Sequence, residues 1–288
     1  MIFNNSDLTV RPADTGDLIP LKKLIQRKSF VHRHLGWGSP LDWLGFQPFL
    51  ILEEGSNILA ALACPPDEDG ITWLRLFVTA PGFSTFRAWN ELWPHAKRIL
   101  QSSRNVTTVN SLVIRPEMEE LLTKAGFSEI YQVVVLVWDI TQASWPPLNK
   151  NVSVRSMQVD DLIKIYEVDR FAFDEIWRNS LSQLDAAFRE AFSATVIELD
   201  GLVGGYQIST ATSQGGHLAR LAVNPVHQSR GIGTSLVADL LDRFQDQGIV
   251  EVSVNTQSVN QSSLDLYRKF GFRLLDDRYP VRQFVFPQ

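Results

Sequence analysis

The stretch "VNPVHQSRGIGTSL", residues 223–236, lies between a run of apolar residues and a segment with the apolar spacing of a helix. Pro225 is expected to end the preceding strand. Gly231 and Gly233 lack a Cβ, so the backbone there can approach a bulky ligand closely. The N–H groups of residues 228–234 then lie at a helix N-terminus, where free donors and the helix dipole favour a phosphate. The stretch is either a plain structural turn or a phosphate-binding loop.

Two well-known phosphate-binding motifs fit this loop poorly. A Walker P-loop requires lysine after its last glycine, and here Thr-Ser follows without it. A Rossmann fingerprint places its glycines directly after the strand and an acid near the end of the next strand. Here seven residues separate Val223 from Gly231, and the next strand ends at residues 255–256, Asn-Thr. A dinucleotide-binding protein is therefore disfavoured.

The composition is that of an ordinary globular protein, with 44% hydrophobic and 20% charged residues among 288. A net charge of −5 argues against a nucleic-acid partner, because such proteins neutralise phosphates. The single cysteine, Cys64, excludes an internal disulfide and a cysteine-cluster zinc site. No secretion signal and no long apolar run is visible, so a cytoplasmic protein without a membrane partner is expected.

The chain also contains an internal repeat with an offset of about 145 residues. Three pairs of segments, together with Glu53 matching Glu198, make four matches in the same order and nearly in one register, which predicts two copies of a fold of about 140 residues. The first pair places Arg75 in register with Arg220. The matching pairs are WLRLFV (73–78) with LARLAV (218–223), KAGF (124–127) with KFGF (269–272), and VRPADTGDL (10–18) with VRSMQVDDL (154–162).

Pro146 and Pro147 mark the join between the copies, because neither continues a helix or a strand. The expected domains are residues 1–140, a linker at 141–151, and residues 152–288.

In the second copy, apolar alternation predicts strands and apolar spacing of three to four residues predicts helices. Gly248 is placed to end the helix that follows the glycine loop. Each copy is expected to be an α/β (α+β) unit, with a mixed, mostly antiparallel twisted sheet flanked by helices. The predicted strands cover residues 152–157, 194–210 as a hairpin, 217–223, 251–256, 273–277 and 281–286; the predicted helices cover residues 162–173, 181–192, 236–244 and 260–270.

Two motifs together resemble the GNAT superfamily of acetyl-CoA-dependent N-acetyltransferases. Gln228-Ser-Arg-Gly231-Ile-Gly233 is similar to the family's pyrophosphate loop, Gln/Arg-x-x-Gly-x-Gly/Ala. "VNQSSLDLYRKFGF" (259–272) is similar to the second hallmark, Asn-x-x-Ala-x-x-Leu-Tyr-x-Lys-x-Gly-Phe, with Ser263 in place of alanine. The resemblance covers the second copy well, whereas the first copy resembles the family only as a degenerate version of the second. It therefore implies a tandem GNAT chain with a degenerate N-terminal copy.

The resemblance implies that acetyl-CoA is the co-substrate and that no metal takes part. The pantetheine arm is expected along the edge of the strand at residues 221–223, and the backbone N–H of Leu221 is the implied oxyanion donor. The implied cofactor-binding residues are Leu221, Ala222, Val223, Gln228, Ser229, Arg230, Gly231, Ile232, Gly233, Thr234, Asn255, Asn260 and Tyr267.

Tyr267 matches the family's general acid, whose hydroxyl protonates the departing sulfur. The alternative is a core residue, because Leu264, Tyr267 and Phe270 recur every three residues on one helix. Asn260 either binds the pantetheine arm or simply caps the helix. His217 is the candidate base, since it precedes the loop on the strand where histone-acetylating family members carry a glutamate. It is otherwise a surface residue, and proton removal through ordered water is the alternative.

In the first copy, every position that carries chemistry has changed. The counterparts of Gln228, Gly231, Gly233, Asn260 and Tyr267 are Phe83, Phe86, Ala88, Arg115 and Leu122.

The expected function is direct acetyl transfer to a primary amine of a small molecule or peptide, by a monomer or homodimer without a nucleic-acid partner. The alternative is a non-catalytic sensor module that binds CoA or acyl-CoA.

Overall fold

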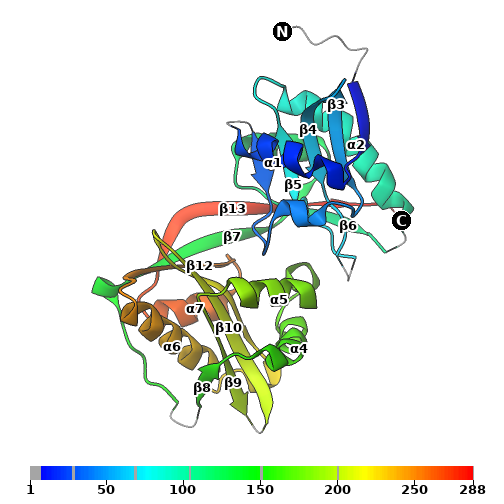
Figure 1. Ribbon diagram of the computed structural model, residues 1–288. Helices are drawn as coiled ribbons and strands as arrows, with labels where there is room; N and C mark the ends of the chain where they lie inside the picture. Colours follow the sequence, from blue (N-terminus) through cyan, green and yellow to red (C-terminus); the bar gives the residue numbers. More distant parts are fainter. Residues whose placement is uncertain are drawn as a thin grey trace. The chain divides into compact units, whose positions relative to one another are not determined.

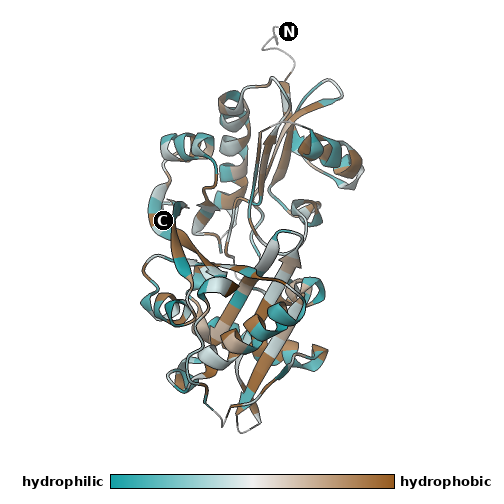
Figure 2. Cartoon of the chain, turned by 90° about the vertical axis from the view of Figure 1, so that its left-hand side faces the viewer, coloured by the Kyte–Doolittle hydropathy of each residue, from teal (hydrophilic) through white to brown (hydrophobic). Residues whose placement is uncertain are grey.

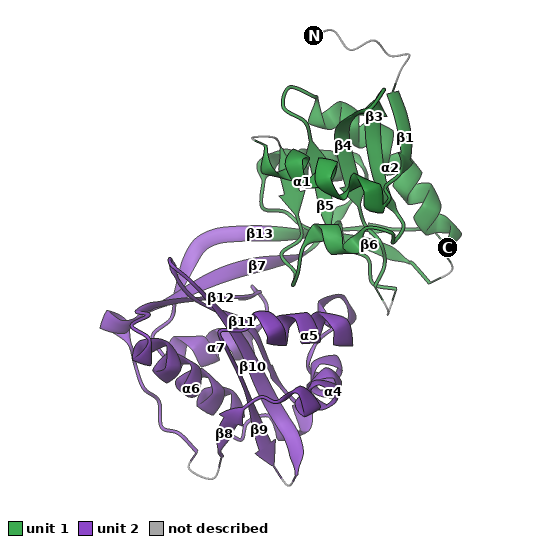
Figure 3. Ribbon diagram, viewed as in Figure 1, with its two compact units in different colours: residues 1–130, 280–288 green, residues 131–279 purple. Residues whose placement is uncertain are grey.

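The computed structural model describes residues 8–27, 30–67, 70–103, 105–149, 152–199 and 201–287 (Figure 1). Its contacts divide the chain into two compact units (Figure 3). Unit 1 contains residues 1–130 together with residues 280–288, and unit 2 contains residues 131–279. Each unit has a mostly antiparallel sheet flanked by helices, which confirms the predicted fold class.

Unit 1 is built on a five-stranded antiparallel sheet with the order β1-β3-β4-β5-β2. In chain order its elements are β1 (Leu8–Pro12), η1 (Thr15–Asp17), α1 (Leu18–Gln26), β2 (Val31–Arg33), η2 (Pro40–Trp43), β3 (Phe49–Glu54), β4 (Asn57–Ala63), β5 (Leu76–Thr79), α2 (Thr85–Ser102), β6 (Thr108–Leu112), α3 (Pro116–Lys124) and the start of β7 (Ser128–Asp139).

In unit 2 the strands follow the order β7-β12-β11-β10-β9-β8, and among the described strand pairs of this unit β11 with β12 is the parallel one. After β7 and η3 (Ile140–Gln142), its elements are β8 (Val154–Ser156), η4 (Val159–Asp161), α4 (Leu162–Ala172), η5 (Glu175–Trp177), α5 (Leu181–Glu190), β9 (Ser193–Leu199), β10 (Leu202–Thr212), β11 (Gly215–Val223), η6 (Pro225–His227), α6 (Ile232–Asp246), β12 (Glu251–Gln257), α7 (Gln261–Lys269) and most of β13 (Arg273–Val285). Gly248, with φ of 73°, follows the end of α6 as predicted.

The internal repeat is visible in equivalent ion clusters. In each copy of the repeat an arginine of the first strand, β1 or β8, binds the aspartate that precedes the first α-helix and a glutamate of a neighbouring strand. The aspartate also accepts a backbone N–H at the turn before the helix, and the arginine lowers the pKa of that aspartate. The same set of bonds therefore fastens the first strand to the first helix twice. The members are Arg11, Asp17 and Glu53 in unit 1, and Arg155, Asp161 and Glu198 in unit 2.

The end of the chain differs from the prediction. The two strands expected at residues 273–277 and 281–286 form one strand of 13 residues, β13. Pro280 lies inside it, and a proline is tolerated in a strand where no ladder bond needs its N–H. Residues 281–285 pair antiparallel with β6, so the last part of the chain belongs to unit 1 rather than to the expected domain 152–288. In the predicted linker 141–151, residues 150 and 151 lie outside the described residues.

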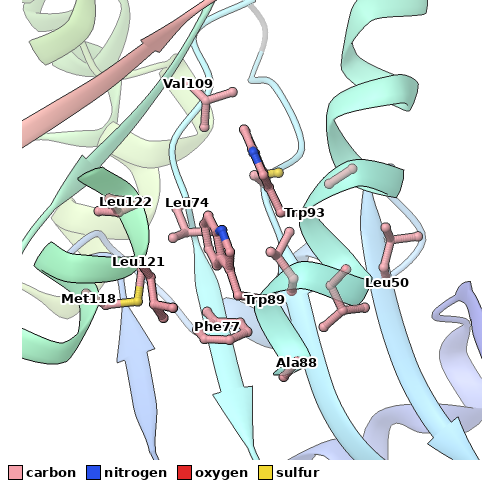
Figure 4. Packing of buried hydrophobic residues seen from close by; sticks show 14 of the residues in the cluster. Leu50, Leu74, Phe77, Ala88, Trp89, Trp93, Val109, Met118, Leu121 and Leu122 are labelled. Carbon is pink, nitrogen blue, oxygen red and sulfur yellow. The ribbon is translucent and has the colours of Figure 1, made fainter. Parts of the chain in front are cut away.

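The core of unit 1 is rich in aromatic rings (Figure 4). Trp89 stacks on Trp93 with ring centroids 5.4 Å apart, and Trp93 meets the edge of Phe284 at 5.4 Å. Figure 2 shows the common pattern of the chain, in which helices have a hydrophobic and a hydrophilic side and the central strands are mainly hydrophobic. The helices cover the sheets with their apolar sides, which is the arrangement that two packed layers require.

Candidate active site

The candidate site begins where β11 separates from its parallel neighbour. The two strands pair only over Gly216–Leu218 with Val252–Val254. Both continue beyond this point, β11 to Val223 and β12 to Gln257. On its other side β11 remains paired with β10 as far as Val223. Within the described part of the chain, the edge of β11 after Leu218 is therefore open.

A β-bulge marks the separation. The register between β10 and β11 shifts after Ile208, which pairs with Arg220, while Ser209 pairs with Leu218. Ala219 is thus an extra residue on β11. Such a bulge bends its strand and is frequent beside active sites.

Leu221 and Val223 direct their backbone groups toward the open edge. The N–H of Asn224 donates to the carbonyl of Gly204 at 2.9 Å, which fixes a hydrogen-bonded pair between β11 and β10. Bonded and non-bonded pairs alternate along an antiparallel ladder, so Ala222 bonds to β10 while Leu221 and Val223 face away from it. The Leu221 N–H is consequently a donor at the point where the strands have separated.

The loop after β11 has an unusual backbone. Ser229 and Gly231 both adopt left-handed φ angles, of 63° and 83°. Among the described residues other than glycine, Ser229 is the one with a positive φ. The Gln228 side chain folds back and donates to the carbonyl of Val223 at 3.4 Å. Left-handed residues in a loop turn successive N–H groups into one concavity.

Six consecutive backbone N–H groups at this loop, from Ser229 to Thr234, donate to no acceptor among the described residues. The first α6 bond to this loop is the next one, from the Ser235 N–H to the Gly231 carbonyl at 2.9 Å. The first N–H groups of any helix lack an intrahelical acceptor, and the curled loop adds further donors in front of them. The arrangement is a group of hydrogen-bond donors suited to an anion.

The glycines permit close packing around these donors. Gly231 precedes α6 in a left-handed conformation that L side chains rarely adopt. A Cβ at Gly233 would lie 3.1 Å from Leu266 Cδ2 on α7. A Cβ at Gly205 would lie 2.8 Å from Ile232 Cγ2, so this glycine lets the start of α6 rest on β10. Gly204 and Gly205 both lie within β10 (Leu202–Thr212), where the register with β9 shifts between Val203 and Gly205.

Tyr267 lies on α7 and is 4% exposed. Its ring packs against Phe272 with centroids 5.4 Å apart, within the core cluster of unit 2. Burial raises the pKa of the Tyr267 hydroxyl far above its usual range, and a hydrogen bond with Ser263 opposes the shift in part. The hydroxyl is therefore protonated at neutral pH, as a proton donor must be, while the ring also serves the core.

His217 lies in the part of β11 that is still paired with β12. Its Nδ1 is 2.9 Å from the Ser253 hydroxyl. Burial lowers the pKa of His217, and the bond with Ser253 acts in the opposite direction. The imidazole is thus neutral near pH 7, but four residues, or about 13 Å of strand, separate it from Leu221. A base at this position would need water to reach an amine bound at Leu221.

The two asparagines have different surroundings. The Asn260 side chain accepts the Ser263 N–H at 3.1 Å and so caps α7. Its second amide contact is to Gln257 Oε1 at 3.4 Å. Asn255 is exposed on β12, one residue beyond the last pair with β11. Glu198 of β9 is bound to Arg155 and lies outside this group of residues.

Sequence reasoning missed a buried polar cluster beside the bulge. Asp169 of α4 is fully buried and accepts hydrogen bonds from the Tyr206 hydroxyl and from two nitrogens of Arg220. One signal was available, because Asp169 falls seven residues after Leu162 on the apolar side of a predicted helix. A charge at such a position requires a buried partner.

Unit 1 lacks the corresponding loop. Ala88 and Leu122, the counterparts of Gly233 and Tyr267, are fully buried core residues (Figure 4). Phe83 is buried, and Phe86 is half exposed where Gly231 would allow a ligand to approach. A cavity of about 310 Å³ exists in unit 1, between α1, β2, η2 and β5, and it contains none of the predicted site residues.

Residues 159–272 match the family model described as "Acetyltransferase (GNAT) family". Curated relatives include a putative ribosomal protein bS18-alanine N-acetyltransferase of Bacillus subtilis, 21% identical over 44% of this chain and 83% of that protein. The Escherichia coli K12 protein named bS18-alanine N-acetyltransferase is 21% identical over 42% of this chain and 80% of its own length.

Solved structures match nearly the whole chain. A tandem GNAT protein from the clavulanic acid biosynthesis pathway has a TM-score of 0.66 at 16% identity, covering 98% of this chain and all of that one. A GCN5-related N-acetyltransferase from Anabaena variabilis has a TM-score of 0.70 at 11% identity, covering 96% of this chain and 72% of that one.

Residues 159–272 thus belong to the GNAT family of acetyltransferases. The chain as a whole shares the fold of a solved tandem GNAT protein, and the GNAT fold uses acetyl-CoA as co-substrate. No helix in the described part of the chain is long and apolar enough to span a membrane. Among the same residues, no group of three His, Cys, Asp or Glu side chains could hold a metal ion.

Proposed function

We propose that this protein transfers an acetyl group from acetyl-CoA directly to a primary amine of a small molecule or peptide, and that unit 2 carries the site. The proposal rests mainly on the six N–H groups from Ser229 to Thr234, which have no acceptor among the described residues, beside the open edge of β11. Donors at a helix N-terminus suit a pyrophosphate, and an open strand edge suits the amides of a pantetheine arm. The residues present therefore fit CoA.

When bound, acetyl-CoA supplies an activated thioester. The Leu221 N–H is free to donate to the oxygen on which negative charge develops during acyl transfer, a contribution of about 10²–10³ in rate. The Tyr267 hydroxyl holds the proton that the departing sulfur requires. His217 is neutral and removes the proton of the attacking amine through water.

The acceptor is expected to carry a free amine. The Bacillus subtilis and Escherichia coli relatives are named for an alanine of a ribosomal protein, which supports an amine on a peptide. A small-molecule amine is the other class to be tested, because the match to these relatives covers less than half of this chain.

The test is thiol release from acetyl-CoA by the full chain, with a panel of polyamines, amino sugars, amino acids and peptides that begin with alanine. Thiol release that depends on one class of amine is the expected result. Tight CoA binding without transfer to any amine would favour the non-catalytic sensor module instead. A chain that binds no CoA would contradict both functions.

A further inference from the structure

The cluster around Asp169 is charged, largely buried and held by several hydrogen bonds. The Asp169 side chain is inaccessible, and the Arg220 side chain is 12% exposed. Arg220 Nε and Nη2 each lie 2.8 Å from a different oxygen of the carboxylate. The Tyr206 hydroxyl donates to the same carboxylate, and so does the N–H of Asn179 at 2.9 Å. Burial, together with this carboxylate, raises the pKa of Tyr206 well above its usual range, so the hydroxyl remains a donor.

Arg220 and Tyr206, which both bind the Asp169 carboxylate, lie on either side of Leu221, the residue with the predicted oxyanion donor. Arg220 directly precedes Leu221 on β11. Tyr206 lies on β10 opposite Ala222, the residue that directly follows Leu221. A single carboxylate on α4 therefore holds the two-stranded segment immediately before and immediately after Leu221.

Arg220 and Tyr206 bind Asp169 in the part of the sheet where β11 is paired with a strand on one side only. Beyond Leu218, β11 has no pair with β12 and contains an extra residue, Ala219. A strand bonded on one side only is free to twist, and a small misplacement of a donor is costly in catalysis. The Asp169 carboxylate on α4 therefore restrains β11 in place of the strand pairing with β12.

The cluster also fixes the segment after α4. Arg220 Nη2 donates to the Trp177 carbonyl at 2.7 Å. The guanidinium lies over the ring of Phe173, 3.6 Å from its centroid. Residues 173–179 are thereby tied to the same carboxylate that holds β11.

A comparison of the two units shows which part of this cluster occurs in both and which part occurs only in unit 2. Arg75, the counterpart of Arg220, is kept in unit 1, where it lies 3.4 Å from Asp67 and over the ring of Trp43. The counterparts of the other two members are apolar: Ala61 takes the place of Tyr206, and Leu24 and Ile25 occupy the matching turn of α1. An arginine at this strand position belongs to both units, whereas the shared Asp–Tyr anchor occurs in the unit with the open strand edge.

We infer that Asp169 and Tyr206 are positioning residues for acyl transfer, which act through Arg220 and β10 to hold the Leu221 N–H in place. This inference rests on the proposed function. Neither side chain has to touch the substrate. Loss of the anchor should reduce turnover and leave the loop from Ser229 to Thr234 intact, so kcat and CoA affinity should respond differently.

The test compares Asp169→Asn and Tyr206→Phe with the control Asp161→Asn. Asp161 also binds an arginine through two nitrogens, at 2.7 and 2.9 Å, but it fastens β8 and takes no part in the site. All three variants are expected to melt at a lower temperature. Only the first two should lose kcat, by about 10-fold to 100-fold, less than the 10²–10³ expected when a donor is removed altogether.

CoA affinity, measured by calorimetry, should stay within about twofold in all three variants. Equal loss of kcat in Asp161→Asn and Asp169→Asn would overturn the inference, because the effect would then be general destabilisation. Full activity in Tyr206→Phe and Asp169→Asn would overturn it as well. If Asp169→Asn does not fold, Tyr206→Phe decides, since it removes a single hydroxyl.

A second measurement does not depend on turnover. With 15N-leucine labelling, the Leu221 amide should give one resonance that moves when acetyl-CoA is added, and it should be broadened or split in Tyr206→Phe but unchanged in Asp161→Asn. If the wild-type chain transfers no acetyl group, the proposed function fails, and this resonance alone decides whether Asp169 and Tyr206 hold the strand. An identical resonance in all three proteins would overturn the inference.

Discussion

Ser229 and Gly231 share a left-handed backbone, although only one of them is a glycine. A left-handed serine costs of order 1 kcal/mol or more, and such strain persists where the surroundings enforce it, often at ligand sites. Here the strained residue carries the first of the six N–H groups that have no acceptor in the described part of the chain. At the residue scale, the candidate site is thus defined by backbone conformation more than by reactive side chains.

The first prediction concerns the size of the residue at Gly233. Gly233→Val should weaken CoA binding by at least about tenfold, because the start of α6, which carries the donor N–H groups, must shift away from Leu266. The Cβ would lie 3.1 Å from Leu266 Cδ2, so a lower melting temperature is expected as well. Gly233→Ala is the matched control and should bind CoA nearly as well as the wild type. Unchanged CoA affinity in a folded Gly233→Val variant would contradict the loop assignment.

The second prediction concerns the hydroxyl of Tyr267. Tyr267→Phe keeps the ring contact with Phe272 and removes only the proton donor. We expect kcat to fall by about 10²–10⁴-fold with little change in CoA affinity. Steady-state kinetics and calorimetry on the same preparation measure both quantities. A variant with most of its activity would show that Tyr267 serves the core alone.

At the scale of elements, β2 of unit 1 contains a buried histidine, His32. His32 is 2% exposed, and its Nε2 lies 3.2 Å from the Ser111 hydroxyl. Burial lowers the pKa of His32 to about 4. The neighbouring His34 is partly buried, and desolvation together with Arg75 lowers its pKa. Both imidazoles are neutral in the folded unit, and a neutral buried histidine disfavours protonation.

The third prediction is therefore a loss of stability in acid. As the pH falls below about 6.5, the unfolded chain gains a proton at His32 and the folded chain does not until about pH 4. The stability contribution is present above about pH 6.5 and is lost toward pH 4, by up to about 3 kcal/mol. Thermal melts between pH 7 and pH 4 should show a shallower slope for His32→Gln, with His95→Gln of α2 as control. Equal slopes for His32→Gln and the wild type would contradict a buried neutral His32.

At the scale of the whole molecule, the chain does not divide at one point of the sequence. Residues 281–285 pair with β6, and Phe284 and Phe286 belong to the core of unit 1. β7, the equivalent strand of the first copy, pairs with β12 in unit 2 from residue 133 onward. The last strand of each copy thus pairs with a strand of the other copy, so neither copy has its complete sheet without the other.

The fourth prediction follows from this pairing. Phe284→Ala should destabilise unit 1 by about 3–5 kcal/mol, since it removes a buried ring that contacts Trp93. Hydrogen exchange should therefore speed up in α2 and β6 and stay slow in α6. Val285→Ala, which shortens an exposed side chain on the same strand, is the control. Equal acceleration in both units would show that they unfold as one.

The fifth prediction is that each chain binds one CoA, in unit 2. Calorimetric titration of the full chain should give a stoichiometry near one. Gly231→Val combined with Gly233→Val should abolish binding, because unit 1 has Phe83 and Phe86 where the curled loop would be needed. A stoichiometry of two, or residual tight binding in the double variant, would overturn the division of roles between the units.

The sequence by itself determined the fold class, the repeat, the family and the position of most helices and strands. These follow from local patterns: the glycine loop, the apolar spacing of α6 and α7, and matching segments at a constant offset. Only the tertiary structure decided which edge of β11 is open, that Ser229 is left-handed, that Asp169 meets Tyr206 and Arg220, and that β13 ends in unit 1. The physical reason is that strand partners and buried ion pairs join residues tens to hundreds of positions apart, and no local pattern records which distant segment will be the neighbour.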